Sequence, residues 1–291
     1  MCVTCGCGAE EARVRLLADN QPDADDQQHH LDHRHYGHEG HPEHDGALEH
    51  HHHHVHGHDR THTLKLEQAV LAKNDHLADH NRNWLASRGL TAINVMSSPG
   101  AGKTTLLERT IIDSGLTLSV IEGDQETTVD AERIRAAGAR SVQVNTGAGC
   151  HLDAAMVRRA LDQLQPETGV VVIENVGNLV CPALFDLGEA RKVVIISVTE
   201  GDDKPLKYPH MFSAADLIVI NKTDLLPYVE FDVEQLTRDA RKLQPGVEVL
   251  ALSARTGDNL DRWFGWLKTL SLDESLGGAA GDQEQLRPLS S

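Results

Sequence analysis

One stretch in the first half of the chain limits what the rest of it can fold into. It reads Ser97-Ser98-Pro99-Gly100-Ala101-Gly102-Lys103-Thr104-Thr105. An apolar run over 92–96 precedes it, and residues 106–112 continue with the apolar spacing of a helix. Small residues let the backbone bend around an anion, and the N–H groups at a helix start point at that anion. The stretch therefore predicts a phosphate-binding loop between a strand and a helix.

The residue types inside this loop assign its chemistry. We expect Lys103 to reach the β- and γ-phosphates of a nucleotide and the Thr104 hydroxyl to bind Mg²⁺. The general pattern begins with glycine where this chain has Ser97, whereas Gly100 and Gly102 keep the turn tight. The predicted phosphate-binding residues are Pro99, Gly100, Ala101, Gly102, Lys103, Thr104 and Thr105.

The charge balance narrows the range of partners. The formal net charge is −17 with histidine neutral. This argues against nucleic acid and against anionic membrane surfaces, because both need a positive protein face. The sequence shows no secretory leader and no run of about 20 apolar residues that would span a membrane. We expect a cytoplasmic protein that does not associate with membranes.

The N-terminal segment is rich in metal-binding side chains. Three of the five cysteines are Cys2, Cys5 and Cys7, a spacing that does not indicate a disulfide framework. Three thiolates and the terminal amine can wrap one ion such as Zn²⁺, Cu⁺ or Ni²⁺, and four ligands of this kind suit tetragonal Ni²⁺. The alternative is a tail with incidental cysteines.

A histidine tract follows at 29–62 and holds fifteen of the nineteen histidines, including the run His50 to His54. Such a density of imidazoles binds Ni²⁺, Zn²⁺ or Cu²⁺ weakly and many ions at a time, which favours storage over catalysis. The run of five also resembles an affinity tag, although the other ten histidines lie scattered around it.

Apolar periodicity divides the chain into four parts. We expect a tail without regular structure over 1–62, a lead-in helix over 63–89, a folded domain over 90–272 and a flexible end over 273–291. His76 and His80 are spaced to share a metal ion on the lead-in helix, but we expect a solvated helix face there. Inside the domain, predicted strands alternate with predicted helices, which indicates an α/β fold with a mostly parallel sheet and helices on both faces. The predicted strands are 92–96, 116–121, 141–145, 169–174, 192–199, 216–221 and 247–252, and the predicted helices are 104–113, 127–137, 152–164, 205–213, 232–244 and 257–270.

A second motif indicates which base the nucleotide carries. The strand 218–220 ends in Asn221-Lys222-Thr223-Asp224. The Asp224 carboxylate can accept hydrogen bonds from N1–H and N2–H₂ of guanine, a pair of donors that adenine lacks. Asn221 is expected to tie the loop and Lys222 to lie over the ring, while Ser253 and Ala254 offer backbone N–H groups to the base. The sequence thus predicts GTP or GDP as the ligand.

Carboxylates at two other strand ends complete the predicted phosphate side. Asp124 is the first choice for a second Mg²⁺ ligand, and Glu122 is the second choice. Glu174 ends another strand and begins a glycine-containing loop that can reorder when the γ-phosphate leaves. We assign catalysis to Lys103, Asp124 and Glu174. No glutamine is obviously placed to orient a water molecule, so we expect slow GTP hydrolysis.

The two remaining cysteines predict a second metal site. Cys150 and His151 follow one predicted strand, and Cys181 follows the Glu174 loop. Loops at the carboxyl ends of parallel strands share one edge of a sheet, so these three side chains can converge on Zn²⁺ or Ni²⁺. The alternative is two small buried cysteines and an ordinary histidine. If the site forms, loss of the γ-phosphate can deform it, and metal affinity should differ between the GTP and GDP states.

Together these motifs resemble the HypB family of hydrogenase nickel-incorporation GTPases, over the tail and over about 63–270. The segments that carry the resemblance are Cys2–Cys7, Ser97–Thr105, Ile121–Thr127, Gly147–Asp153, Glu174–Ala183, Thr199–Pro209 and Asn221–Asp224. The resemblance implies a P-loop GTPase that forms a GTP-linked homodimer, hydrolyses GTP slowly and delivers nickel through a HypA-type partner to the large subunit of [NiFe] hydrogenase. It also implies a nickel site at Cys2, Cys5 and Cys7, and a site for Ni²⁺ or Zn²⁺ at Cys150, His151 and Cys181.

Some interpretations stay open at this stage. The stretch Leu225–Val229 serves either dimer contacts or packing inside the domain, and Lys204 and Lys207 are candidates for contacts with phosphate or the second subunit. A urease-type nickel GTPase is an alternative function, but its expected Cys-x-His is not present because residue 183 is alanine. A passive nickel or zinc buffer is the alternative from a different class.

Overall fold

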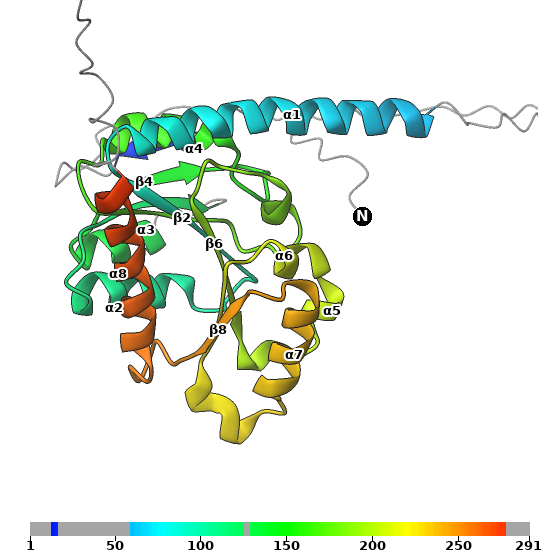
Figure 1. Ribbon diagram of the computed structural model, residues 1–291, viewed down its shortest axis with the longest axis vertical. Coiled ribbons are helices and arrows are strands. Elements are labelled where there is room, and N and C mark those ends of the chain that lie inside the picture. Colours follow the sequence, from blue (N-terminus) through cyan, green and yellow to red (C-terminus); the bar gives the residue numbers. More distant parts are fainter. Residues whose placement is uncertain (1–12, 17–58, 125–128, 278–291) are drawn as a thin grey trace, which may run out of the picture. The chain divides into compact units, whose positions relative to one another are not determined.

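The protein is described by a computed structural model that covers residues 13–16, 59–124 and 129–277 of the 291-residue chain. Figure 1 shows a central twisted sheet with helices on both faces. The strands are β1 (Arg13–Leu16), β2 (Thr91–Ser97), β3 (Leu118–Asp124), β4 (Arg140–Asn145), β5 (Val170–Glu174), β6 (Arg191–Ser197), β7 (Leu217–Asn221) and β8 (Glu248–Ala251). The α-helices are α1 (Asp59–Ala86), α2 (Lys103–Asp113), α3 (Val129–Ala136), α4 (Ala154–Leu164), α5 (Lys204–Lys207), α6 (Pro209–Ser213), α7 (Val233–Leu243) and α8 (Leu260–Gly277). Three 3₁₀ helices are η1 (Cys181–Leu184), η2 (Val198–Glu200) and η3 (Thr223–Tyr228).

The sheet has the strand order β1-β4-β3-β5-β2-β6-β7-β8. Strands β2 to β8 are all parallel to one another, and β1 pairs with β4 in the antiparallel direction. Strands β2 to β7 are buried over most of their length, as expected for a sheet that helices cover on both sides. Their carboxyl ends therefore meet at one edge, where the predicted ligand-binding residues also lie.

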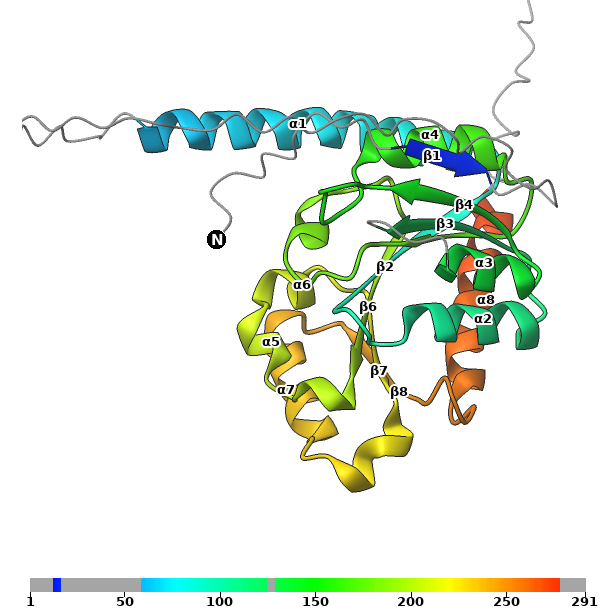
Figure 2. The same cartoon turned by 180° about the vertical axis from the view of Figure 1, so that it is seen from behind.

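Helices cover the two faces of the sheet in separate groups. Figure 2 shows α2, α3 and α8 together on one face, and their buried apolar side chains form one core cluster with the strands. On the other face, α4 and the end of α1 pack over β3, β4 and β5, while α6 and α7 pack over β6 and β7. From Ala69 onward, α1 belongs to the same compact unit as the sheet.

The structure confirms the predicted fold class and corrects several boundaries. The segment 1–62, expected to lack regular structure, contains strand β1, and α1 already begins at Asp59. The predicted helix 205–213 is two short helices, because Pro209 cannot donate the backbone hydrogen bond that would join them. Helix α8 continues to Gly277, past the expected domain end at residue 272. None of the helices in the described part of the chain is long and apolar enough to cross a membrane.

Candidate nucleotide and metal sites

The phosphate-binding loop runs from β2 to the start of α2, as the sequence predicts. Gly102 has φ +95°, and a Cβ atom there would lie 2.5 Å from the Asn221 side-chain nitrogen, so this position needs glycine. Ser97, which replaces the usual first glycine, accepts a hydrogen bond from Lys103 Nζ at 2.9 Å. The Ser97 hydroxyl therefore holds the Lys103 ammonium over the loop, beside the N-terminus of α2.

The Asn221 side chain ties the base loop to the phosphate-binding loop. Its Nδ2 donates to the Ala101 carbonyl at 2.9 Å, and its Oδ1 accepts from the Lys222 and Ala254 N–H groups at 2.7 and 3.0 Å. Lys222 Nζ donates to the Gly100 carbonyl at 2.7 Å. The Ser253 hydroxyl donates to Asp224 Oδ1 at 2.7 Å and orients the carboxylate that is predicted to read guanine. The structure thus brings these base-loop residues together beside the phosphate-binding loop.

Two buried carboxyl groups lie behind the start of α2. The Thr104 hydroxyl donates to Glu174 Oε1 at 3.0 Å, and Glu122 pairs with Glu174 across β3 and β5. Burial raises the pKa of Glu174 to about 7. Burial, and then the charge of Glu174, raise the pKa of Glu122 to about 9. One oxygen of each carboxyl is buried without a hydrogen-bond partner among the described atoms.

Hydroxyl and carboxylate oxygens are the ligands that Mg²⁺ prefers, so this oxygen-rich edge fits the predicted ion. Asp124, the first choice from sequence, ends β3 in a half-buried position, and its carbonyl accepts from the Thr146 N–H at 2.9 Å. The second choice, Glu122, lies directly beside Glu174. The hydrogen bond from Thr104 places the Glu174 carboxyl group directly on the predicted Mg²⁺-binding hydroxyl.

The structure also brings Cys150, His151 and Cys181 together. Their ligand atoms all lie within 4.8 Å of one another, and Cys150 Sγ is 3.7 Å from His151 Nδ1. Cys150 and His151 lie in the loop between β4 and α4, and Cys181 begins η1 after β5. The His151 ring packs on Phe185 with centroids 4.1 Å apart, and burial lowers its pKa, which favours the neutral imidazole that binds metals. Two thiolates and one imidazole suit Zn²⁺ or Ni²⁺.

Sequence reasoning missed a side chain that links the two sites. Asn175 follows Glu174 and is almost completely buried. Its Oδ1 accepts from the Leu152 N–H at 3.1 Å and from the Val176 N–H at 3.0 Å, and its Nδ2 donates to Asn94 Oδ1 at 3.3 Å. Leu152 directly follows His151, so one hydrogen bond joins the Glu174 segment to the histidine of the metal cluster. The only signal in the sequence was its place beside Glu174.

Other predicted residues have mixed outcomes. Cys2, Cys5, Cys7 and the tract at 29–58 lie outside the described residues. His76 and His80 are exposed on α1, and their Nε2 atoms are 3.3 Å apart. In the stretch Leu225–Val229, Leu225 and Leu226 pack against the domain core, whereas Tyr228 is 82% exposed.

The two candidate lysines pair with nearby carboxylates. Lys204 lies 3.8 Å from Glu200, which accepts a hydrogen bond from the Ser98 hydroxyl, and Lys207 pairs with Asp203 at 2.6 Å. Lys204 is therefore linked to the phosphate-binding loop through Glu200.

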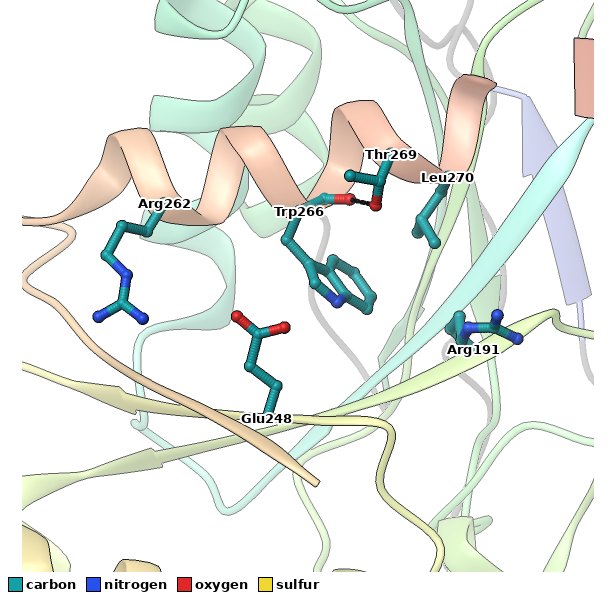
Figure 3. Close-up of a pocket in the computed structure, with 6 residues that line it drawn as sticks. All are labelled: Arg191, Glu248, Arg262, Trp266, Thr269 and Leu270. Carbon is teal, nitrogen blue, oxygen red and sulfur yellow. Dashed lines mark hydrogen bonds between the residues drawn. The ribbon is translucent and has the colours of Figure 1, made fainter. Parts of the chain in front are cut away.

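A separate cavity of about 470 Å³ lies at the opposite edge of the sheet, where the strands begin. Figure 3 shows Glu248, the first residue of β8, below Trp266 of α8, with Arg191, the first residue of β6, at the side of the cavity. Its remaining lining residues are Arg262, Thr269 and Leu270. Because the nucleotide loops follow the other ends of the strands, this cavity is not part of the candidate site.

The strand order around the phosphate-binding loop, with the Asn221 loop beside it, defines a P-loop nucleotide-binding protein of the GTPase type. The family described as CobW/HypB/UreG, nucleotide-binding domain, matches residues 91–251. The chain is 56% identical over 208 residues to Hydrogenase maturation factor HypB of Azotobacter chroococcum mcd 1, covering 70% of this chain and 68% of that protein. It is 54% identical over 209 residues to Hydrogenase maturation factor HypB of Escherichia coli strain K12, covering 71% and 72%. The chain belongs to this family of HypB hydrogenase maturation factors.

Solved structures agree with this assignment. The crystal structure of HypB from Helicobacter pylori in complex with nickel superposes with a TM-score of 0.67 at 39% sequence identity. That match covers 69% of this chain and 96% of the Helicobacter chain. HypB from Archaeoglobus fulgidus gives a TM-score of 0.65 at 41% identity and is covered completely.

Proposed function

We propose that this protein is a GTP-hydrolysing nickel chaperone that delivers nickel to the large subunit of [NiFe] hydrogenase during maturation. The observation that carries the proposal is the cluster of Cys150, His151 and Cys181, joined through Asn175 to the carboxyl group facing Thr104. Family membership supports the hydrogenase pathway, and the Helicobacter relative was crystallised with nickel.

In the nucleotide step, Lys103 and the N–H groups at the start of α2 bind the phosphates, and Asp224 selects guanine. Mg²⁺ bound by Thr104 and the nearby carboxylates would neutralise charge on the β- and γ-phosphates. Glu174 is buried and accepts a hydrogen bond from the Thr104 hydroxyl. Loss of a phosphate at Thr104 would therefore change the contacts of Glu174 directly. We retain slow hydrolysis as part of the proposal.

The metal step uses the segment that follows Glu174. Asn175 holds the Leu152 N–H next to His151, and the same segment continues to Cys181. Loss of the γ-phosphate therefore acts on the ligand loops through backbone that is continuous with the nucleotide site. We expect metal affinity to differ between the GTP and GDP states, and equal affinities would contradict this coupling.

A homodimer that forms with GTP is the assembly we propose. Val180 and Leu184 flank Cys181 and are 54% and 51% exposed, so an apolar surface surrounds one metal ligand. A second copy over this surface would shield the metal from water.

Cys2, Cys5 and Cys7 are proposed to capture nickel, and the histidine tract is proposed to store it. A HypA-type chaperone is proposed to take part in the transfer.

Substitution of Lys103 by alanine tests the proposal in cells that lack the endogenous gene. We expect hydrogenase activity to fall while total nickel bound by the protein is unchanged. Maturation that persists at the wild-type level would instead support a passive nickel or zinc buffer. Recovery of activity on adding excess nickel to the deletion strain would place the protein in the nickel pathway.

A urease-directed role is the second candidate function. It is favoured by a Helicobacter pylori relative named Hydrogenase/urease maturation factor HypB, which is 40% identical over 209 residues. Urease activity measured in the same deletion strain decides between the two: loss of hydrogenase activity alone supports the hydrogenase assignment.

A further inference from the structure

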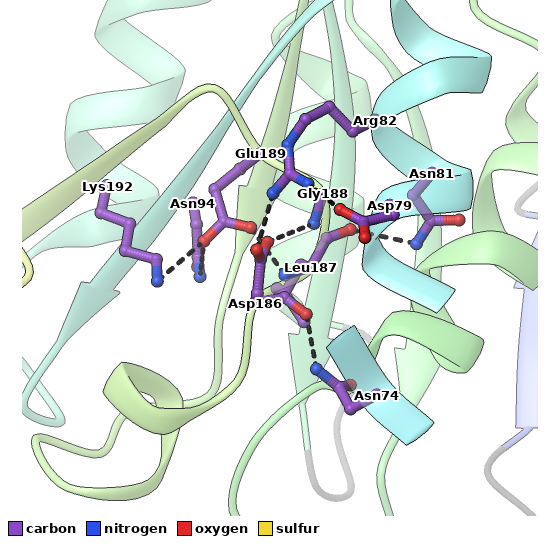
Figure 4. Close-up of polar contacts among 10 residues, drawn as sticks. All are labelled: Asn74, Asp79, Asn81, Arg82, Asn94, Asp186, Leu187, Gly188, Glu189 and Lys192. Carbon is purple, nitrogen blue, oxygen red and sulfur yellow. Dashed lines mark hydrogen bonds and ion pairs between the residues drawn. The ribbon is translucent and has the colours of Figure 1, made fainter. Parts of the chain in front are cut away.

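Two asparagines of helix α1 each bind both of the loops that carry the metal-ligand cluster. Asn74 Nδ2 donates to the Asp186 carbonyl at 2.7 Å, and Asn74 Oδ1 accepts from the Ala154 N–H at 2.9 Å. Asn81 Nδ2 donates to the Ala154 carbonyl at 2.8 Å and to the Leu187 carbonyl at 3.0 Å. Figure 4 shows both side chains reaching from α1 toward the segment Asp186–Gly188.

The partners of these asparagines lie close in sequence to the three ligands. Ala154 follows His151 by three residues and is the first residue of α4. Asp186 follows Cys181 by five residues, and its neighbour Phe185 packs on the His151 ring. Each asparagine thus spans from the loop of Cys150 and His151 to the loop of Cys181.

The contact between α1 and the second loop is tight enough to fix their separation. Gly188 has φ +91°, and a Cβ atom there would lie 2.6 Å from the Ala78 carbonyl oxygen and from Asn81 Cβ. Arg82 donates to Asp186 at 2.6 Å, and the other oxygen of that carboxylate accepts from the Gly188 N–H at 2.8 Å. Asn81 is completely buried, and Asn74 is 6% exposed.

We propose that Asn74 and Asn81 are positioning residues that set the separation of the two ligand loops and thereby the metal affinity of the cluster. This inference rests on the proposed metal site and adds a role for α1 that the nucleotide chemistry does not require. Outer-shell groups that orient metal ligands commonly change affinity by about 10- to 100-fold when they are removed. We expect a loss in that range for either asparagine.

The test uses the full chain with Cys2, Cys5 and Cys7 replaced by serine, so that Cys150 and Cys181 are the only remaining thiolates. Ni²⁺ is titrated while the thiolate-to-metal charge-transfer absorption is recorded, since the histidine tract contributes nothing to this signal. Asn74→Ala and Asn81→Ala are expected to weaken binding by about 10- to 100-fold and to shift the absorption band. Asn83→Ala is the matched control, because Asn83 lies on the same helix with an exposed side chain.

Affinity for a fluorescent GDP analogue is measured for every variant. We expect it to stay at the wild-type value, because none of the hydrogen bonds of Asn74 and Asn81 reach the phosphate or base loops. The parent protein is the chain that carries the three serine replacements and both asparagines. Absence of the charge-transfer band in this parent would contradict the proposed metal site itself. A normal band in the parent with unchanged affinity in both alanine variants would overturn the positioning role alone. Loss of GDP binding together with metal binding would also overturn it, since α1 would then support the whole fold.

A second observation, independent of the first, concerns His76 and His80 on the exposed side of α1. Their rings meet edge to face with centroids 4.7 Å apart, and the two Nε2 atoms are separated by 3.3 Å. Two imidazole nitrogens that bind one ion at about 2.05 Å with a tetrahedral angle are also about 3.3 Å apart. The two nitrogens, which share a hydrogen bond in the structure, therefore have the separation that one bound ion would require.

We infer that His76 and His80 form a binding site for one divalent ion of the Zn²⁺ or Ni²⁺ class, with water completing the coordination. The structure places both histidines on an exposed face of α1, as expected, and the proposed ion would bind on that face. The pair lies on α1, the same helix that carries Asn74 and Asn81 and that follows the histidine tract in the sequence. An ion bound there would bridge one turn of α1.

Hydrogen–deuterium exchange of the full chain, resolved by mass spectrometry, tests this second site. Zn²⁺ is expected to slow amide exchange in α1 peptides that contain His76 and His80, because a chelate across one turn resists helix opening. His76→Ala and His80→Ala should remove this protection, and His210→Ala, which changes another exposed histidine, should leave it in place. Unchanged exchange in the wild type, or protection that persists in the two α1 variants, would overturn the site.

Discussion

Asn175 accepts a hydrogen bond from the Leu152 N–H, so replacing Asn175 should remove the effect of the bound nucleotide on metal affinity. Replacing Asn175 by alanine removes the acceptor of two backbone N–H groups and the donor to Asn94. Glu174 and Cys181 themselves stay in place. The substitution therefore acts on the connection between the sites and leaves the groups proposed to bind phosphate, Mg²⁺ and nickel unchanged.

Two consequences differ in size. Each of the two buried N–H groups left without a partner costs about 1–3 kcal/mol, so Asn175→Ala should destabilise the fold by about 2–6 kcal/mol. Allosteric coupling between two ligands typically amounts to about 5- to 150-fold in affinity. We expect the ratio of Ni²⁺ affinities with a non-hydrolysable GTP analogue and with GDP to lie in that range for the parent protein. In Asn175→Ala this ratio should fall close to one.

The parent protein is the full chain with Cys2, Cys5 and Cys7 replaced by serine, so that Cys150 and Cys181 carry the thiolate signal. The assay is a Ni²⁺ titration of this chain in each nucleotide state, followed by the thiolate-to-metal absorption. Urea unfolding of the same variant measures the loss of stability. Asn175→Asp is the control, because it keeps an acceptor for the Leu152 N–H and should retain most of the coupling. If Asn175→Ala binds both ligands with the parent's affinity ratio, the connection through Leu152 does not carry the coupling.

Three further perturbations follow from the geometry. Gly188→Ala should destabilise by about 1–3 kcal/mol more than Gly138→Ala in thermal unfolding, because both have positive φ but only Gly188 meets neighbouring atoms within 4 Å; equal losses would contradict tight docking of α1. Gly102→Ala should abolish GDP binding in a fluorescence titration, since its Cβ would displace Asn221, and GDP binding at the parent's affinity would contradict this. The raised pKa of Glu122 means that it favours folding below its ordinary pKa near 4.5 and that this contribution is lost as the pH rises toward about 9. Glu122→Gln should therefore flatten the decline in the unfolding free energy of the nucleotide-free protein over that window, and an unchanged pH profile would refute this.

The sequence allowed the nucleotide edge to be predicted because its chemistry is local. Gly102, Lys103 and Thr104 are adjacent in the chain, and their residue types alone indicate that they bind a phosphate. The approach of Cys181 to Cys150 was also predictable, since both follow strands of a parallel sheet and such strands end at one edge.

Contacts between distant segments were not predictable in the same way. Strand β1 has only four residues in an acidic segment, and its pairing with β4 depends on residues more than one hundred positions away. The roles of Asn74, Asn81 and Asn175 depend on which backbone groups the fold leaves without partners, which no local pattern reveals. In the sequence, an asparagine on a helix cannot be told from an ordinary polar surface residue until its buried partners are known.

The distribution of hydrogen bonds shows how the two halves of the metal cluster are held. The loop of Cys150 and His151 is held from both sides, by Asn175 at Leu152 and by Asn74 and Asn81 at Ala154. The loop of Cys181 is held by α1 only from Asp186 onward, and the exposed Val180 and Leu184 flank Cys181 itself. The two loops are also joined to each other, because Asn178 Nδ2 donates to the Cys150 carbonyl at 3.3 Å. On the proposed function, a change at Glu174 would therefore reach the Cys150 loop by two routes, through Asn175 at Leu152 and through Asn178 at Cys150.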